Sequence, residues 1–262
     1  MNDNDYMTNR TEYIAAHNKK TATDESVDRV TAIVLAAGKG SRMHSDIPKQ
    51  FMMLGAYPVL YYSLMEFQNS PVDDIVLVTG KDSLDYCRKD IVERYNLTKV
   101  RQIVTGGAER YDSVYSGLNA ASGAQYVLIH DGARPCITQK IIRDSIDAVK
   151  VYSACTVGVP VKDTIKVVDE DQMGVETPDR SRLWQIQTPQ SFDRKLLLAC
   201  YEGLAHDKCQ IITDDTMIVE RYSNVRTKVI MGAYENLKIT TPEDLKIAEN
   251  FLKKDVDTKI VK

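Results

Sequence analysis

The sequence predicts an α/β fold: a Rossmann-like, mostly parallel twisted sheet with helices on both faces. Short apolar runs rich in β-branched residues, which are typical of strands covered on both faces, alternate with helical patterns along the chain. This alternation is typical of βαβ units, which join parallel strands by right-handed crossovers. The chain has 262 residues, enough for one α/β domain with an elaboration or for two small domains.

The first strand is expected at residues 30–37, because Val30-Thr31-Ala32-Ile33-Val34-Leu35-Ala36-Ala37 is a continuous apolar run. Further strands are expected at residues 75–78, 100–104, 126–129, 156–159 and 228–231. Helices are expected at residues 60–67, 82–95, 113–121, 139–151, from 193 onward, and at 213–222. A last helix is expected from Thr241-Pro242-Glu243-Asp244, which has proline at the first helical position and an acid three residues after the threonine.

Two segments depart from the alternation. Residues 162–182 are charged and poor in large aliphatic side chains, so they are expected to form a long loop or an extended hairpin within a folded domain at 29–262. A loop of this length is usually functional or packs on a partner. Residues 1–28 are polar and lack the apolar region of a signal peptide, so a flexible polar leader is expected there.

Composition excludes several classes of protein. The net charge of −3 gives no broad positive field, so we expect no nucleic-acid partner. No apolar run approaches the ~18 residues that a membrane span requires, so we expect no membrane partner. The five cysteines are odd in number and show no CxxC spacing, which indicates reduced thiols and a cytoplasmic location.

A glycine loop follows the first strand, as Ala36-Ala37-Gly38-Lys39-Gly40-Ser41-Arg42-Met43. Ligands of open α/β sheets bind at the carboxyl ends of strands, so the loop is placed for a nucleotide. The Walker A spacing fails, and Met43 stands where the dinucleotide fingerprint needs a third glycine. The pattern A-A-G-x-G-x-R-M followed by Pro48-Lys49 is instead the signature of nucleotidyltransferases that activate sugars and polyol phosphates. Arg42 and Lys49 would neutralise a triphosphate; the alternative is a tight surface turn with two solvated basic residues.

Two further loops follow predicted strands. Gly106 and Gly107 precede a helix, whose free N–H groups could bind the polar edge of a base; the alternative is a turn capped by Asp112 or Ser113. Asp131, in His130-Asp131-Gly132-Ala133-Arg134-Pro135, ends another strand and could hold Mg²⁺, or it could be a turn or cap residue. His130 is expected to pack or to form hydrogen bonds. Asp214 and Asp215 are expected to cap the helix that follows them.

Seven motifs in a fixed order point to one family. They are AAGKGSRM with PKQ, GGAERYDSV, HDGARP, VPVKDTIK, RSRLWQIQTPQSF, TDD and NLKITTPEDL. With them the chain resembles the 2-C-methyl-D-erythritol 4-phosphate cytidylyltransferases of the non-mevalonate isoprenoid pathway, from about residue 30 to about residue 252. The resemblance implies transfer of CMP from CTP to the methylerythritol phosphate, with release of pyrophosphate and with Mg²⁺ as cofactor.

The resemblance also implies roles for individual residues. CTP would be bound by Ala36, Ala37, Gly38, Gly40, Gly107, Ser113 and Asp131, with Asp131 near the metal. Arg42, Lys49 and Lys238 would be catalytic. The polyol phosphate would be held by Arg134, Thr164, Arg180, Thr188 and Thr213. Ala108 stands where many relatives carry aspartate, and Glu235 receives no metal role.

The resemblance implies a homodimer as well. Residues 161–182 would form an arm that embraces a second subunit, so that Thr164 and Arg180 complete the partner's site. Two other functions stay open. One is a ribitol 5-phosphate cytidylyltransferase with the same fold and chemistry, against which the VPVKDTIK and TDD motifs weigh. The other is a non-catalytic nucleotide-binding module, which would be free to lose Arg42, Lys49 or Asp131.

Overall fold

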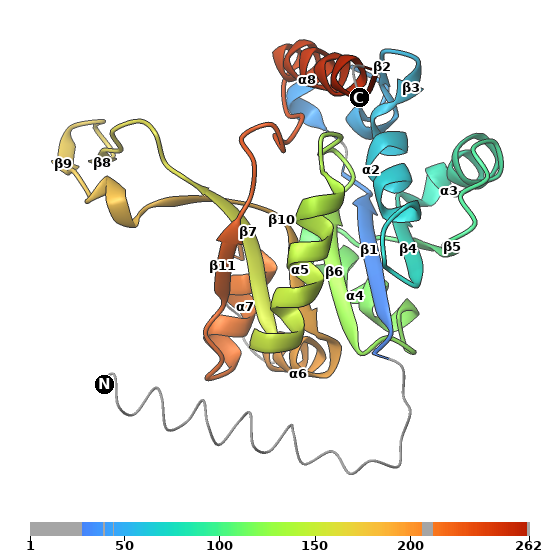
Figure 1. Cartoon of the computed structure of the whole chain (residues 1–262). Coiled ribbons are helices and arrows are strands. Elements are labelled where there is room, and N and C mark those ends of the chain that lie inside the picture. The colour runs from blue at the N-terminus through green and yellow to red at the C-terminus, as the bar shows by residue number, and fades with distance from the viewer. Residues whose placement is uncertain (1–27, 39, 44, 206–211, 261–262) are drawn as a thin grey trace.

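The computed structural model describes residues 28–38, 40–43, 45–205 and 212–260. The leader expected at residues 1–28 therefore lies outside the described residues, except for its last position. A seven-stranded twisted sheet forms the centre of the molecule, in the order β11-β7-β10-β6-β1-β4-β5 (Figure 1). The strands are β1 (Val30–Ala36), β4 (Asp74–Thr79), β5 (Val100–Thr105), β6 (Tyr126–Asp131), β7 (Ala154–Pro160), β10 (Trp184–Asp193) and β11 (Lys228–Met231).

Six of these strands run in one direction, and β10 runs against both of its neighbours. β1 pairs in parallel with β4 and β6, β4 pairs in parallel with β5, and β11 pairs in parallel with β7. β10 is antiparallel to β6 and to β7, with an irregular register between Ile186 and Gln190. The mostly parallel sheet predicted from the sequence is confirmed, but the sheet is mixed because of β10.

Helices cover both faces of the sheet, as predicted. On one face, α2 (Val59–Gln68) and α5 (Gln139–Tyr152) pack on alternate residues of β1 such as Ala32 and Val34. On the other face, α4 (Arg110–Ala120), α6 (Arg194–Ala205) and α7 (Asp215–Tyr222) pack around Ile33. The side chains of β1 alternate between two cores because successive strand residues point to opposite faces.

A helical segment between β4 and β5 covers one end of the core that lies beneath α2 and α5. It comprises a 3-10 turn (Lys81–Ser83), α3 (Leu84–Tyr86) and a π-helix (Cys87–Glu93). The helix expected at residues 82–95 is therefore present, but it is not a regular α-helix. Cys87 and Ile91 are its buried contacts with the core.

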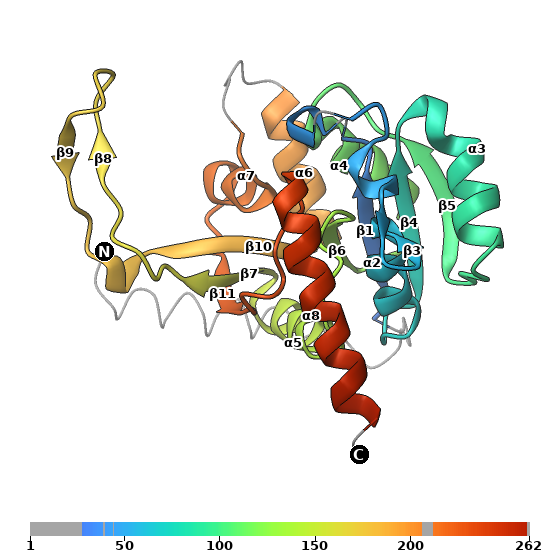
Figure 2. The same cartoon turned by 90° about the horizontal axis from the view of Figure 1, so that it is seen from above.

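A third, smaller core lies over the carboxyl ends of the strands. Here α8 (Pro242–Ile260) packs against a short hairpin of β2 (Met53–Leu54) and β3 (Tyr57–Pro58), as the views from the side and from above show (Figures 1 and 2). The start of α8 is capped as predicted, because the Asp244 carboxylate accepts hydrogen bonds from the backbone N–H groups of Thr240 and Thr241. The 3-10 turns Ser41–Met43 and Lys49–Phe51 lie in the segment between β1 and this hairpin.

The segment after β7 forms an arm that projects away from the sheet (Figures 1 and 2). It carries the antiparallel strands β8 (Val167–Val168) and β9 (Gly174–Glu176), followed by a 3-10 turn (Arg180–Arg182). The extended hairpin is thus the correct one of the two alternatives for residues 162–182. Its aliphatic side chains are solvent-exposed, and Met173 and Val175 are 65% and 66% accessible.

Two further observations bear on the class of protein. No helix within the described ranges is long and apolar enough to cross a membrane. The four cysteines that lie in those ranges, Cys87, Cys136, Cys155 and Cys200, are buried thiols that form no disulfide with one another.

Candidate active site

Four parallel strands bring the predicted loops to one edge of the sheet. The strands end at Ala36 (β1), Thr79 (β4), Thr105 (β5) and Asp131 (β6). The predicted loops follow β1, β5 and β6 at this edge. The carboxyl ends of neighbouring parallel strands lie together, which is where ligands bind in open α/β sheets. The candidate site is therefore built at this edge, beneath α8.

The glycine loop after β1 is held by a buried glutamine. Gln50 is 3% exposed, and its Nε2 donates to the carbonyl oxygens of Ala36, at 2.6 Å, and Gly38, at 3.1 Å. Gly40 has a φ of +65°, and a Cβ there would lie 3.2 Å from Cγ of Lys49. Glycine is needed at position 40 both for the left-handed backbone and for the close passage of the lysine stem.

Lys49 points toward the loop that precedes α8. Its Nζ donates to the carbonyl oxygen of Ile239 at 2.8 Å. Burial lowers the pKa of Lys49 to about 8, and the positive charges of Lys238 and Arg42 add to the effect while Asp131 opposes it. Lys49 thus lies within electrostatic range of Arg42, Asp131 and Lys238, as expected for a group that faces an anionic ligand.

Asp131 is the centre of the cluster. Its Oδ2 lies 2.8 Å from Nζ of Lys238 and 3.9 Å from Nε of Arg134, and its Oδ1 lies 3.6 Å from Nε of Arg110. Burial alone would raise the pKa of Asp131, but Arg110, Lys238 and Arg134 outweigh burial and hold it well below its usual range. Asp131 is therefore ionised at neutral pH.

Arg134 carries an unused donor toward this cluster. Its NH1 donates to the carbonyl oxygen of Asn236 at 2.7 Å, whereas its Nε is buried without a hydrogen-bond partner. A buried donor without a partner is costly. An anionic ligand beside Asp131 would satisfy it.

The second loop contacts the first one. The backbone N–H of Gly107 donates to Oγ of Ser113 at 3.2 Å, and a Cβ on Gly106 would lie 2.7 Å from the Cβ of Ala37. The structure therefore brings the two predicted nucleotide loops together, with Ser113 5% exposed between them. Asp112 does take part in capping α4, since its carboxylate accepts from the backbone N–H of Glu109.

His130 is buried behind Asp131 and packs and forms hydrogen bonds, as predicted. Its Nδ1 lies 3.0 Å from Oγ1 of Thr188, and burial lowers its pKa to about 3, so the imidazole is neutral. Thr188 is 4% exposed, and its hydroxyl also accepts from the backbone N–H of Asp131 at 3.1 Å. In this structure Thr188 therefore supports the end of β6.

Three predicted residues do not join this cluster within one chain. Thr164 and Arg180 are exposed on the arm, where NH1 of Arg180 donates to the carbonyl oxygen of Lys162. Thr213 is exposed just before α7, and its hydroxyl contacts Sδ of Met217. The helix expected to begin at Thr213 begins at Asp215, after Asp214 caps it by accepting from the Met217 N–H.

Sequence reasoning missed several polar residues of the site. The most important are Arg110 and Asp215, whose side chains form an ion pair of 2.8 Å directly behind Asp131. Asp215 was expected to cap a helix, but it is fully buried and paired. Arg110 lies within GGAERYDSV, so the motif contained the signal, and only the fold shows that the two residues meet.

A divalent cation would fit the site with Asp131 as its carboxylate ligand and substrate phosphates as further ligands. No group of three or more His, Cys, Asp or Glu side chains suited to a metal occurs in the part of the chain that the structure describes. Asp131 offers one carboxylate, surrounded by cations. Mg²⁺ is commonly held by one or two carboxylates together with substrate phosphates and water, and Asp131 suits that arrangement.

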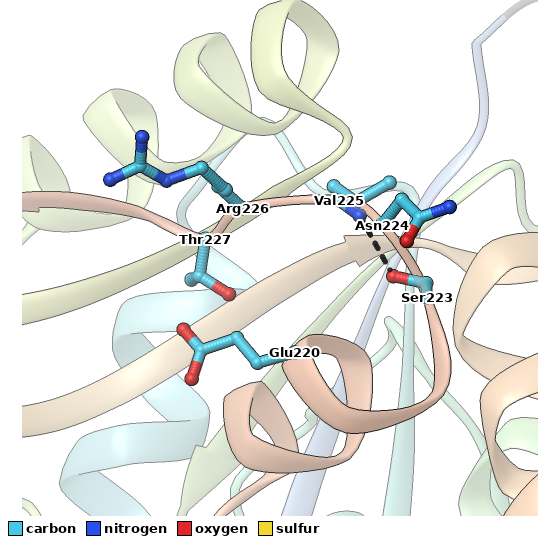
Figure 3. A pocket seen from close by; sticks show the side chains of 6 residues that line it. All are labelled: Glu220, Ser223, Asn224, Val225, Arg226 and Thr227. Carbon is cyan, nitrogen blue, oxygen red and sulfur yellow. Dashed lines mark hydrogen bonds between the residues drawn. The ribbon is translucent and has the colours of Figure 1, made fainter. Parts of the chain in front are cut away.

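The carboxyl edge is distinct from a surface pocket between α7 and β11. That pocket is lined by Glu220, Ser223, Asn224, Val225, Arg226 and Thr227. Figure 3 shows Glu220 facing Thr227 and the hydrogen bond from Val225 N to the Ser223 hydroxyl. It lies at the amino end of β11, opposite the edge that carries the cluster, and it contains none of the predicted site residues.

Comparison with known proteins agrees with these observations. The sequence pattern of the family described as 2-C-methyl-D-erythritol 4-phosphate cytidylyltransferase (IspD) matches residues 30–254. The protein of that name from Lachnospira eligens is 51% identical over 225 residues, which are 85% of this chain and 99% of the relative. The one from Clostridium novyi is 50% identical, over 84% of this chain and 95% of the relative. A crystal structure of 4-diphosphocytidyl-2C-methyl-D-erythritol synthase from Anaerococcus prevotii is 34% identical, with a TM-score of 0.75, over 86% of this chain and 99% of that one.

Proposed function

This chain belongs to the 2-C-methyl-D-erythritol 4-phosphate cytidylyltransferase family, and from that premise we propose how its residues transfer CMP from CTP to methylerythritol 4-phosphate. The observation that carries the proposal is the convergence of Lys49, Arg134 and Lys238 around Asp131 at the carboxyl edge of the sheet. A polyanion is the ligand that such a cluster fits.

In the proposed reaction, a phosphate oxygen of the polyol phosphate attacks the α-phosphorus of CTP in line with the leaving group. The new P–O bond forms as the bond to the β-phosphate oxygen breaks, and pyrophosphate leaves with that oxygen. The nucleophile needs no general base, because a phosphate monoester is largely ionised near pH 7. This agrees with the neutral, buried state of His130.

The basic residues would act by position and charge. Arg42, Lys49 and Lys238 stabilise the negative charge that grows on the α-phosphate and on the departing pyrophosphate. Ala36, Ala37, Gly38 and Gly40 offer backbone donors to the triphosphate, and Gly107 and Ser113 face the base. Arg134, with its unused Nε, is assigned to the polyol phosphate. Thr188 and Thr213 are assigned to the same ligand by the family resemblance alone, since the Thr188 hydroxyl supports the end of β6 and Thr213 lies outside the cluster.

Mg²⁺ is proposed as the metal, held by Asp131 and the triphosphate. When bound, it would polarise the α-phosphorus and neutralise phosphate charge. Asp131 is suited to this role because it is ionised and pairs with Leu35 of β1, beside the start of the glycine loop.

We further propose that the arm, residues 161–182, forms a homodimer. The exposed aliphatic side chains Val168, Met173 and Val175 support this, because several large apolar side chains exposed on one projecting segment are a feature of contact sites. Thr164 and Arg180 lie on the arm and make no hydrogen bond or ion pair with the Asp131 cluster of their own chain among the described residues. They would complete the site of the partner subunit.

The proposal is tested by pyrophosphate release from CTP and Mg²⁺, with methylerythritol 4-phosphate and ribitol 5-phosphate compared as acceptors. Strong preference for methylerythritol 4-phosphate is the expected result. Preference for ribitol 5-phosphate would keep the CTP chemistry and overturn the acceptor. Binding of CTP without release from either acceptor would contradict the enzyme assignment.

A further inference from the structure

Asp215 is a fully buried acid at the first position of α7. Its carboxylate accepts from NH1 of Arg110 and from the Tyr201 hydroxyl, each at 2.8 Å. Its backbone N–H donates to Oε1 of the buried Gln190 at 2.9 Å. A buried carboxylate with this many partners is fixed in place, because breaking such a network by removing one partner is strongly destabilising.

Arg110 connects this network to the site. It is the first residue of α4, and its guanidinium has Asp215 on one side and Asp131 on the other, at 2.8 and 3.6 Å. Burial opposes its charge, but the two carboxylates outweigh burial and raise the pKa of Arg110, so it stays protonated. Because Asp215 neutralises Arg110, the pair adds no net charge to the site.

The two oxygens of Asp131 consequently have different neighbours. Oδ1 faces Arg110, which Asp215 anchors, whereas Oδ2 faces Lys238 at 2.8 Å and Arg134 at 3.9 Å. The Lys238 side chain is 37% exposed and has a flexible stem, so its contact with Oδ2 is exchangeable. The contact with Oδ1 is anchored from behind.

We propose that Arg110 and Asp215 are positioning residues that hold Oδ1 of Asp131, so that Oδ2 stays directed at the ligand when Lys238 moves onto the triphosphate. This inference rests on the proposed function and deepens it. Arg110 and Asp215 act through Asp131 and need no contact with the substrate.

The first test uses Asp215→Asn and Arg110→Lys. Asp215→Asn leaves the shape at position 215 but removes the charge that anchors Arg110. We expect kcat to fall by about 10- to 100-fold, the range found when a group that orients a metal ligand is lost. The half-saturating Mg²⁺ concentration should rise, while the affinity for CTP in EDTA, measured by calorimetry, stays unchanged. Arg110→Lys should retain more activity than Arg110→Gln because it keeps the charge.

The matched control is Asp74→Asn. Asp74 is also a nearly buried carboxylate that faces two arginines, Arg29 and Arg101, but it begins β4 at the opposite edge of the sheet. Loss of its charge should lower the melting temperature without changing the half-saturating Mg²⁺ concentration. A merely structural role for Asp215 would give the same result as this control and would overturn the proposal.

A double-mutant cycle gives the second test. In an Asp131→Asn background, Asp215→Asn should change calorimetric affinity for CTP with Mg²⁺ by less than about twofold, because residues that act through one another are not additive. If Asp215→Asn weakened the affinity for CTP with Mg²⁺ by the same factor in the wild-type and Asp131→Asn backgrounds, the inference would be overturned. If Asp215→Asn does not fold, Tyr201→Phe, which removes one hydrogen bond to Asp215, carries the same expectations. If wild-type protein releases no pyrophosphate, the proposed function fails, while the cycle still tests the inference.

Discussion

Lys238 Nζ lies 2.8 Å from Oδ2 of Asp131, which ties the loop before α8 to the end of β6. The contact joins residues more than a hundred positions apart in the chain. It also places the lysine where it can transfer from the carboxylate to a phosphate. The first prediction concerns this lysine.

Replacing Lys238 by methionine should reduce kcat by at least about 100-fold, the scale of losing one group that stabilises transition-state charge. The measurement is steady-state pyrophosphate release at saturating CTP. Lys246→Met, at an exposed position on α8, is the control and should keep wild-type turnover. A Lys238→Met enzyme with wild-type kcat would contradict the role assigned to this lysine.

The second prediction concerns the proton on Lys49. Because burial and neighbouring cations lower its pKa to about 8, the lysine loses its proton and its charge as the pH rises through that value. We expect kcat/KM for CTP, which reports on the free enzyme, to fall above about pH 8. Lys49→Arg should not show this fall, because a guanidinium stays charged throughout the range. Identical pH profiles for the two proteins would contradict the assignment.

The third prediction concerns acid stability and His130. The pKa of this buried imidazole is about 3, below the 6.5 of an ordinary histidine, so the unfolded chain binds the proton more readily between these values. Stability from the neutral histidine is therefore complete above about pH 6.5 and is lost as the pH falls toward 3, by about 2 kcal/mol at pH 5. In urea unfolding, the free energy of unfolding of His130→Gln should fall less steeply with decreasing pH than that of the wild type. The difference in this free energy between the two proteins should therefore narrow on acidification. A constant difference would be the contrary result.

The fourth prediction concerns Gln50, which fixes the glycine loop through two carbonyl oxygens. Gln50→Glu removes the side-chain N–H donors and places a carboxylate against the two carbonyl oxygens. The change should destabilise the loop by about 1–3 kcal/mol. We expect the KM for CTP to rise at least fivefold, on the order of 1 kcal/mol of lost binding. The control is Gln102→Glu, at an exposed glutamine that donates to the Ala120 carbonyl. An unchanged KM in Gln50→Glu would show that the loop does not depend on this clamp.

Much of the fold could be predicted from hydrophobic pattern. The β1 strand and the helices α2 and α5 lie within a few residues of their expected bounds, because continuous apolar runs and amphipathic periods determine them directly. β10 was missed, since Gln185, Gln187 and Gln190 interrupt its apolar pattern. Those polar side chains are used in the folded protein, where Gln187 donates to the Ala233 carbonyl and Gln190 to Asp214.

The candidate site could be predicted only where its residues lie in loop motifs. Lys49 and Asp131 could be found because they follow strand ends in recognisable patterns. The partnership of Arg110 with Asp215 could not, because it joins residues 105 positions apart and depends on how α4 and α7 are arranged around α6, which contacts both helices. Likewise, a pattern that suggested a helix cap at Asp215 carried no information about its burial.

The fifth prediction tests whether two chains share one active site. If Arg180 of one subunit completes the site that contains Lys49 of the other, Lys49→Ala and Arg180→Ala disable sites in a complementary way. Each variant alone should lose at least about 100-fold in turnover, as expected for removal of a charged transition-state contact. A mixed dimer would have one site with both defects and one site with neither.

Random mixing of the two chains makes about half of the dimers mixed, and each mixed dimer has one intact site of its two. Coexpression should therefore restore about a quarter of wild-type activity. The readout is pyrophosphate release per subunit after purification through two different affinity tags, which isolates the mixed dimer and should double the recovered fraction. Lys49→Ala mixed with Asp131→Asn is the control. Because both of these residues belong to the same chain's cluster, each site of that mixed dimer keeps one defect. Recovery in the control as well, or in neither mixture, would contradict a site that is completed by the partner's arm.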